Sequence, residues 1–299
     1  MKFSSNILSN SITKLCLANE IDHVVISPGS RNAPLIIGFT QQSDFTCFSI
    51  VDERCAAFFA IGLAQQLKKP VALVCTSGSA LLNYYPAIAE AFYSDIPLVI
   101  ISAGRPSHLI DIGDGQTIRQ ENVFKNHILY SANCKDGDDP YANQILIDKA
   151  LKVAIHQKGP VHINAPFSEP LYEQSSKTVL NKFEIGRPDA SATKAFSEDF
   201  EILAKKWNSS GQKMILVGVL DPDSIEQRFL DILANDDSVI VLTEVTSNLH
   251  HNSFITAIDQ LIAPLNDSGF NTLRPEILLT FGGMVVSKKI KAFLREYGP

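Results

Sequence analysis

Side chains that could do chemistry stand directly after short apolar segments of this sequence, and an acid is the clearest of them. Glu53 lies in Asp52-Glu53-Arg54 and is followed by mostly apolar residues. Burial among apolar groups raises the pKa of a carboxyl, and such a carboxyl can share a proton with a ligand. Acids are also favoured in the first turn of any helix, so ordinary helix capping is the alternative.

Two arginines follow turns made of small residues. Arg31 stands in the segment SPGSRNAP, residues 27–34, and Arg105 stands between Gly104 and Pro106. A guanidinium, together with the backbone N–H groups of a turn that opens a helix, can hold a carboxylate or a phosphate. The alternatives are an ordinary strand-to-helix turn with Ser and Asn as helix caps, and a solvated loop arginine.

A third turn and a long loop supply further candidates. The segment TSGSALLNYYP, residues 76–86, has small residues that would let a ligand approach the backbone, although such residues are also good helix caps. Gln116 follows the Gly-Asp-Gly run at 113–115 and could hydrogen-bond a reacting carbonyl. Lys288 follows a predicted strand and could contact an anion, or could be the solvated start of a helix.

The elements that must position these residues alternate between helices and strands over the first 165 residues. The spacing of apolar residues predicts strands at 23–26, 45–51, 71–75, 98–102 and 161–164. It predicts helices from residue 7, near residue 33, and at 52–69, 79–93 and 142–156. Strands that are apolar throughout bury both faces, so this order predicts an α/β fold with a doubly wound parallel sheet. The carboxyl ends of such strands form ligand crevices, and the candidates lie there.

A linker and a second α/β series follow the first domain. From Pro166 to about residue 195 the pattern fades into Pro166, Pro170, Pro188 and a stretch rich in Ser, Glu and Lys, which predicts a linker at 176–198 between a domain at 1–175 and a second domain at 199–299. In the second domain we expect strands at 214–219, 239–243 and 277–281, and helices at 200–207, from 221 and at 287–297. Three strands are few for a doubly wound domain, so a partial central α/β domain is expected.

Composition excludes several classes of function. The chain has 26 Lys and Arg against 32 Asp and Glu, a net charge of −6, without a block of like charge. Nucleic acid and membrane surfaces, which require a clustered basic face, are therefore not expected as partners. The five cysteines form no CxxC pair and the histidines lack metal-ligand spacing, so no disulfide framework and no metal site is predicted. The longest apolar run, residues 96–103, is too short to cross a bilayer, and a cytoplasmic protein is expected.

Read together, five segments resemble the N-terminal domain of a family of thiamine-diphosphate-dependent synthases of menaquinone biosynthesis. In chain order they are SPGSRNAPL, VDERCAAFFAIGLA, CTSGSALLNYYPAIAEA, PLVIISAGRP with IDIGDGQTIRQ, and GPVHINAPFSEPLY. The resemblance covers roughly residues 1–175, and the glycine-ended segment before Ser287 and Lys288 resembles the middle domain of that family. The fold it implies for the first domain is the pyrimidine-binding type of parallel sheet.

The resemblance implies a reaction and a role for each matching residue. The reaction is decarboxylation of 2-oxoglutarate with thiamine diphosphate, followed by 1,4-addition of the succinyl unit to isochorismate. Glu53 matches the catalytic glutamate that hydrogen-bonds the aminopyrimidine ring of the cofactor, and Gln116 matches a glutamine beside the reacting centre. The remaining matches are cofactor contacts at Pro28, Ser77, Gly78 and Asn83, and contacts to substrate carboxylates at Ser30, Arg31, Arg105 and Lys288.

The resemblance also implies a divalent cation, Mg²⁺ or Mn²⁺, bound with the diphosphate by a third domain. The Gly-Asp-Gly run at 113–115 imitates the start of the motif of that domain, but it follows a loop and no Asn pair comes after it. We therefore expect no metal ligand here, a missing C-terminal domain, and an inactive isolated chain. Because sites in this family form between subunits, a homodimer or homotetramer is expected. Gly115 also stands where the family often has asparagine.

Two other functions remain open at this stage. The chain could be a non-catalytic α/β module that keeps only the fold and the dimer surface. It could also belong to another thiamine-diphosphate carboligase, such as an acetolactate synthase, although the arginine of SPGSRNAPL and the DER stretch disfavour that choice.

Overall fold

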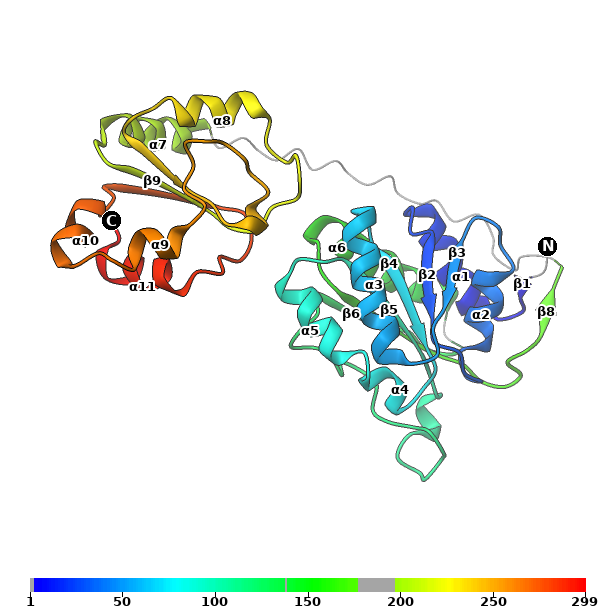
Figure 1. Ribbon diagram of the computed structural model, residues 1–299. Helices are drawn as coiled ribbons and strands as arrows, with labels where there is room; N and C mark the ends of the chain where they lie inside the picture. The colour runs from blue at the N-terminus through cyan, green and yellow to red at the C-terminus, as the bar shows by residue number, and fades with distance from the viewer. Residues whose placement is uncertain (1–2, 138, 177–196) are drawn as a thin grey trace. The chain divides into compact units, whose positions relative to one another are not determined.

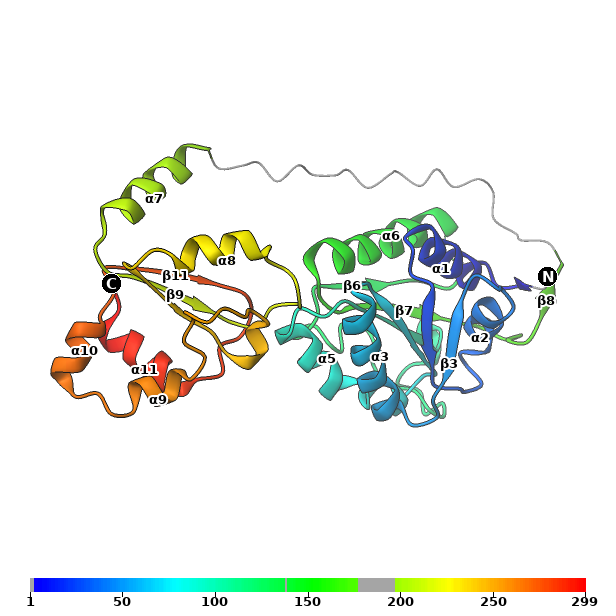
Figure 2. The ribbon, with the colours of Figure 1, turned by 45° about the horizontal axis from the view of Figure 1, so that its top comes forward.

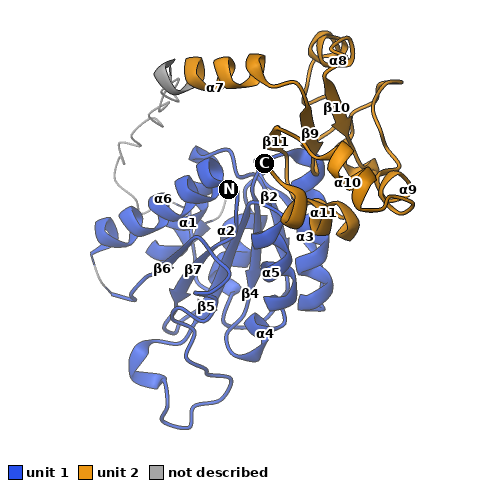
Figure 3. Cartoon of the chain, turned by 90° about the vertical axis from the view of Figure 1, so that its left-hand side faces the viewer, with its two compact units in different colours: residues 1–190 blue, residues 191–299 orange. Residues whose placement is uncertain are grey.

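The computed structural model describes residues 3–137, 139–176 and 197–299, and it divides into two compact units, residues 1–190 and 191–299 (Figure 3). The linker expected at 176–198 lies outside the described residues, apart from residues 176, 197 and 198. Each unit is described here by itself. Among the described residues, no helix combines the length and the apolar character that crossing a membrane would require.

Unit 1 is built on a sheet of six parallel strands, which confirms the predicted fold class (Figure 1). Its strand order is β3-β2-β4-β5-β7-β6. The strands are β2 (His23–Ile26), β3 (Thr46–Ser49), β4 (Val71–Cys75), β5 (Leu98–Gly104), β6 (Tyr130–Asn133) and β7 (Val161–Pro166). Every residue of β4, β5 and β7 is buried, because these central strands are covered on both faces.

Helices cover the two faces of this sheet (Figure 3). One face packs against α1 (Ile7–Ala18), α2 (Ala33–Thr40) and α6 (Pro140–Gln157). The other packs against α3 (Glu53–Leu67) and α5 (Tyr85–Tyr93). Asn6, Asp52 and Asp139 cap α1, α3 and α6 by accepting hydrogen bonds from backbone N–H groups of the first helical turn.

The chain leaves neighbouring strands β2 and β4 toward opposite faces of the sheet. After β2 it enters α2 on one face, whereas after β4 it enters α4 (Ser79–Leu82) and α5 on the other. Where adjacent strands send their connections to opposite faces, a crevice opens between their carboxyl ends. The order of the strands therefore predicts a ligand site beyond residues 26 and 75.

In unit 1 one predicted helix is wrong, and three short strands were not predicted. The helix predicted at 79–93 is divided into α4 and α5, because Pro86 cannot continue a helix from the preceding turn. β6 was missed because its sequence, Tyr-Ser-Ala-Asn, is too polar to read as a buried strand. The short antiparallel pair of β1 (Phe3–Ser4) and β8 (Gln174–Ser175) was missed because its strands have two residues each and are far apart in the sequence.

Unit 2 contains a smaller parallel sheet of order β10-β9-β11 (Figure 2). Its strands are β9 (Lys213–Val217), β10 (Val239–Leu242) and β11 (Ile277–Phe281), as predicted. Its helices are α7 (Ser197–Ser209), α8 (Gln227–Ala234), α9 (Ile258–Ile262), α10 (Asp267–Leu273) and α11 (Lys288–Tyr297). The helix predicted from residue 221 is wrong. Asp223 adopts a left-handed backbone (φ 57°), which a helix cannot contain, and α8 begins later.

Candidate active site

Two turns meet at the carboxyl ends of β2 and β4, where the strand order predicts a crevice. A Cβ atom placed on Gly29 would lie 2.5 Å from the Cβ of Thr76, so only glycine allows the turns this close approach. Below them the hydroxyl of the fully buried Tyr84 lies 3.0 Å from the Val74 carbonyl and 3.2 Å from Ser27 Oγ. Tyr84 thus links the turn after β2 to strand β4 by hydrogen bonds.

Glu53 opens helix α3, and its carboxylate acts electrostatically on groups at the end of β4. The pKa values of the buried Cys75 thiol and Tyr84 hydroxyl are raised, first by burial and additionally by the Glu53 carboxylate. The Glu53 side chain is half-buried and has no hydrogen-bond or ion-pair partner among the described residues. Asp52 takes the capping role instead, because its carboxylate accepts the Cys55 N–H at 2.9 Å. Glu53 is therefore left free for a ligand.

The surroundings of Glu53 differ from those expected from the sequence. A carboxyl enclosed by Cys55, Ala56 and Phe58 was expected, but Cys55 is exposed and the Phe58 side chain is 47% exposed. Residues that follow Glu53 on α3 face the sheet or solvent with the period of an amphipathic helix, and of the three expected neighbours only Ala56 is buried. The groups whose pKa values the Glu53 charge raises are instead the Cys75 thiol of β4 and the Tyr84 hydroxyl.

Arg31 is buried, with 7% of its surface exposed, and its charge is already paired. Its Nη1 donates to the Phe167 carbonyl at 2.9 Å, and its Nη2 lies 3.2 Å from the Glu169 carboxylate. Its Nε has no hydrogen-bond partner among the described residues. The strand-to-helix turn thus places a buried guanidinium at the carboxyl edge of the sheet, with one donor still unused.

Arg105 repeats this pattern at the end of β5. Its Nε lies 3.4 Å from the Asp114 carboxylate, and its Nη2 donates to the Gly115 carbonyl at 3.1 Å. Both partners belong to the long loop between β5 and β6, which extends away from the body of unit 1 (Figure 1). Arg105 therefore ties the loop to the sheet.

Gln116, Ser77 and Gly78 form a contact between that loop and the turn after β4. The Gln116 side-chain amide donates to the Ser77 carbonyl at 3.2 Å, and Ser77 Oγ donates to the Gln116 carbonyl at 3.1 Å. Gly78 adopts a positive φ of 83°, and a Cβ there would lie 2.9 Å from Gln116. Two predicted contact residues and the predicted catalytic glutamine are thus brought together.

The other predicted residues lie in more open positions. Pro28 and Ser30 are exposed on the turn after β2, and Asn83 is exposed with its amide donating to the Ser79 carbonyl at 3.2 Å. Lys288 is an exposed residue of unit 2, at the start of α11, whereas the crevice described above is formed by residues of unit 1.

A buried polar network beneath this site was not found from the sequence. The Gln120 side chain accepts the Gly78 N–H at 3.2 Å, and its amide nitrogen lies 3.2 Å from Ser102 Oγ and 3.1 Å from Asn164 Oδ1. Ser102 Oγ also lies 2.7 Å from Nε2 of His162, whose pKa burial lowers to about 3. Polar residues at alternating positions 162 and 164 of an otherwise apolar strand were the available signal.

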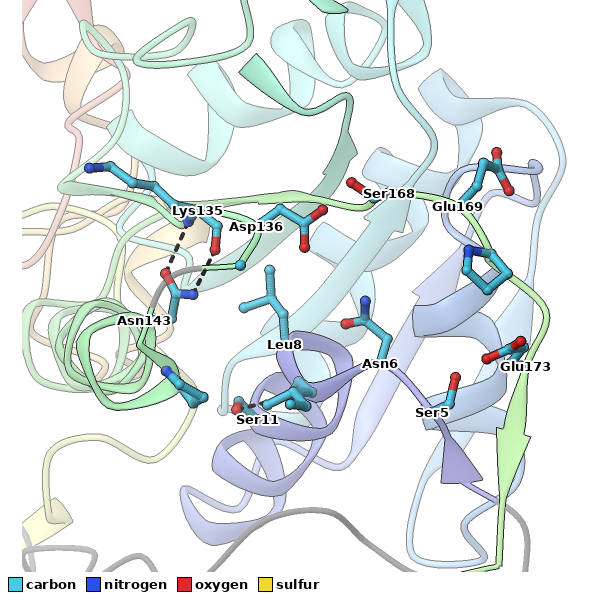
Figure 4. A pocket seen from close by; sticks show the side chains of 14 residues that line it. Ser5, Asn6, Leu8, Ser11, Lys135, Asp136, Asn143, Ser168, Glu169 and Glu173 are labelled. Carbon is cyan, nitrogen blue, oxygen red and sulfur yellow. Dashed lines mark hydrogen bonds between the residues drawn. The ribbon is translucent and has the colours of Figure 1, made fainter. Parts of the chain in front are cut away.

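A separate pocket of about 310 Å³ lies on the α1 and α6 side of unit 1 (Figure 4). The N-terminal ends of these two helices form it, together with residues 135–137 and 168–173. None of the residues predicted for the site lines this pocket, but Glu169, the partner of Arg31, lies at its edge (Figure 4). The described residues hold no cluster of three or more His, Cys, Asp or Glu side chains that could bind a metal ion.

Comparison with known proteins finds relatives of this chain. Residues 8–128 match the family model described as "Thiamine pyrophosphate enzyme, N-terminal TPP binding domain". The whole chain is 57% identical to the 2-succinyl-5-enolpyruvyl-6-hydroxy-3-cyclohexene-1-carboxylate synthase of Christiangramia forsetii and covers 56% of it. Over 98% of its length it is 59% identical to the synthase of that name from Flavobacterium psychrophilum, of which it covers 52%.

The solved structure of benzoylformate decarboxylase from Polynucleobacter necessarius has the same fold. It superposes with a TM-score of 0.62 at 19% identity, over 80% of this chain and 43% of that one. The chain spans about half the length of the curated relatives it matches. Residues 8–128 are thus similar to the N-terminal thiamine-pyrophosphate-binding domain of thiamine pyrophosphate enzymes, and the whole chain is similar to these synthases over about half of their length.

Proposed function

We propose that this chain supplies the pyrimidine-binding side of the active site of a 2-succinyl-5-enolpyruvyl-6-hydroxy-3-cyclohexene-1-carboxylate synthase. The reaction would be decarboxylation of 2-oxoglutarate and 1,4-addition of the succinyl unit to isochorismate. One observation carries the proposal. Glu53, a carboxylate without a partner among the described residues, lies at the carboxyl edge of the sheet, where the strand order predicts a crevice and where two arginines also lie. Identity to synthases that carry this name supports the same reading.

The residues of the crevice fit the aminopyrimidine half of thiamine diphosphate. When bound, this cofactor supplies the carbon centre that takes up the electrons released as the 2-oxo acid loses carbon dioxide. Glu53 would hold and return a proton at a ring nitrogen, which an acid without an internal partner is free to do. Ser77 and Gly78 are buried and Gln116 packs against Gly78, so they are proposed as cofactor contacts on the strength of their match to the family motifs.

The remaining residues of the site would bind and orient the substrates. Gln116 would present its amide to the reacting carbonyl, and Ser30, Arg31 and Arg105 would bind carboxylates. The two substrates carry four carboxylates between them, and guanidinium groups bind carboxylates with matched pairs of hydrogen bonds. Pro28, Asn83 and Lys288 are proposed as further contacts on the strength of their match to the family motifs.

Other parts of the enzyme would hold the rest of the cofactor. Because the described residues offer no metal cluster, we propose that Mg²⁺ or Mn²⁺ and the diphosphate are bound by the portion of the synthases that this chain does not match. A homodimer or homotetramer would then bring that portion of one subunit to Glu53 of another.

Complementation tests this proposal. The purified chain alone should give no measurable consumption of 2-oxoglutarate with isochorismate. Addition of, or fusion to, the unmatched portion of the F. psychrophilum synthase should produce turnover that depends on thiamine diphosphate. Turnover by the chain alone at rates typical of an enzyme would contradict the division of the site, and a complemented protein without any turnover would contradict the assigned reaction.

A further inference from the structure

The partners of Arg31 come from one short segment that continues β7. Phe167 is fully buried and its N–H donates to the Gly104 carbonyl at 3.0 Å, so the Phe167 carbonyl that accepts from Arg31 is a fixed acceptor. Glu169, two residues later, has a side chain that is 67% exposed, against 8% for Arg31. The guanidinium is thus held on one side by rigid backbone and on the other by a movable carboxylate.

The two halves of this ion pair have different solvation energetics. A buried guanidinium without a counter-charge is strongly destabilising, because it cannot lose its proton and it has lost its hydration. An exposed glutamate that leaves an ion pair is rehydrated, and such pairs contribute little. Glu169 can therefore be released at low cost, provided that another carboxylate takes its place at Arg31.

Space for the released side chain is present. Glu169 lies at the edge of the 310 Å³ pocket, so its carboxylate can turn into solvent instead of into packed side chains (Figure 4). A carboxylate ligand could use both Nη2 of Arg31, once freed, and the Nε that has no partner now. Two parallel N–H donors match the two oxygens of a carboxylate.

We propose that Glu169 is an internal counter-ion of Arg31, which a substrate carboxylate displaces when it binds. The inference rests on the proposed function in taking Arg31 as a carboxylate contact, and it adds Glu169 as a positioning residue that competes with the substrate. Glu169 keeps the buried guanidinium neutralised and oriented in the free protein. It also sets the affinity for the anion, since each binding event must break this ion pair.

The test follows the Arg31 Nε–H signal by nitrogen-15 NMR in the full 299-residue chain. The signal is assigned by its loss in Arg31→Lys. 2-Oxoglutarate and chorismate, a stable isomer of isochorismate, are titrated separately at constant ionic strength. Glu169→Gln removes the competing charge. The probe that contacts Arg31 should therefore bind this variant with a dissociation constant about two- to fivefold lower than for the wild type, the range expected for loss of one exposed ion pair. Glu169→Asp, too short to keep the pair, should fall between them.

Glu173→Gln is the matched control, because Glu173 is an exposed acid of the same segment and lines the same pocket. Its dissociation constant should equal that of the wild type. If Glu169→Gln binds equally or more weakly, or if Glu173→Gln tightens binding as much, the counter-ion role is overturned while Arg31 remains a carboxylate contact. If neither probe moves the Arg31 signal in any of these proteins, the proposed carboxylate contact fails as well.

Discussion

Glu53 and Arg31 lie at the same edge of one sheet, yet the fold treats their charges in opposite ways. The Glu53 carboxylate has no partner among the described residues, whereas the Arg31 guanidinium has two. Asp52 caps helix α3 by accepting the Cys55 N–H, so the Glu53 carboxylate is not needed as a helix cap. On the basic side of the site, Arg105 is paired with Asp114 just as Arg31 is paired with Glu169.

This difference fits the roles proposed above for the Glu53 carboxyl and the Arg31 guanidinium. A carboxyl that exchanges a proton with a ligand cannot also be locked in an ion pair, because the pair would lower its pKa and hold it ionised. A guanidinium never releases its proton, so a buried one needs a counter-charge whenever its ligand is absent. We infer that the Glu53 carboxyl is kept available for proton exchange. The guanidinium groups of Arg31 and Arg105 are kept paired with carboxylates that a ligand can replace.

The largest expected effect is on the acid. In the complemented enzyme, Glu53→Gln should lower the rate of 2-oxoglutarate consumption by about 100- to 10,000-fold, the usual contribution of a positioned general acid or base. Asp52→Asn is the control, because asparagine also caps helices and the rate should stay near that of the wild type. Equal losses in the two variants would show that helix α3, and not the Glu53 proton, is what the rate depends on.

The next largest effect concerns the buried guanidinium of Arg31. Arg31→Gln should raise the KM for one of the carboxylate substrates by about 10- to 150-fold, which corresponds to loss of a hydrogen bond to a charged group. Lysine at this position should not restore the KM, because it lacks the planar pair of donors. Steady-state kinetics of the complemented enzyme would check this, and full rescue by Arg31→Lys would argue for a simple charge effect.

A backbone substitution sharpens the comparison by moving Gln116 without changing any charge. Gly78→Ala places a Cβ 2.9 Å from Gln116 at a φ of 83°, so we expect a loss of about 1–3 kcal/mol in the free energy of unfolding and a lower kcat. Gly113→Ala is the control. Its φ is 85° but nothing lies within 4 Å, so it should cost only backbone strain and leave kcat unchanged. Urea denaturation and kinetics separate the two.

A fourth effect, on stability and not on rate, concerns His162, a base that the fold keeps neutral. Burial lowers its pKa to about 3, so between about pH 6.5 and pH 3 the unfolded chain binds a proton that the folded chain does not. Stability should therefore fall on acidification, by about 1.4 kcal/mol for each pH unit in that window.

The pH dependence should be measured on unit 1. Trp207, the single tryptophan, lies in unit 2, so tryptophan fluorescence reports on that unit and near-ultraviolet circular dichroism of the tyrosines reports mainly on unit 1. In His162→Gln the free energy of unfolding of unit 1 should fall less steeply with decreasing pH, by the amount that corresponds to one proton. An unchanged slope would show that another group causes the loss.

Much of the fold, but less of the site, could be predicted from the sequence. The strands at 23–26 and 71–75 were found because they are apolar throughout, and strands of this kind lie inside a parallel sheet. Helix α3 was found because Asp52 caps it and apolar residues follow at helical spacing. Signals of this sort lie within a single stretch of chain.

The charge state of the site depends on contacts between distant residues. Arg31 and the Phe167 carbonyl are 136 residues apart, and Gln120 reaches Gly78 across 42 residues. The motifs placed Arg31 at a turn and Gln116 on a loop, but no local pattern shows that the guanidinium is already paired or that Gln120 supports the turn. The free carboxylate of Glu53 was predicted as an acid in an apolar hollow, and the structure shows its charge acting on β4 and Tyr84 instead.

The most direct test of the central claim measures a carbon-bound proton of the cofactor whose removal Glu53 is proposed to promote by sharing its own proton with the ring nitrogen. The complemented enzyme is loaded with thiamine diphosphate in deuterium oxide, quenched with acid after set times, and examined by proton NMR for loss of the acidic ring proton of the cofactor. With Glu53 in place this exchange should be at least about 100-fold faster than with Glu53→Gln, while cofactor affinity changes little. Equal exchange rates in the two proteins would contradict the assignment of Glu53 as the acid of the site.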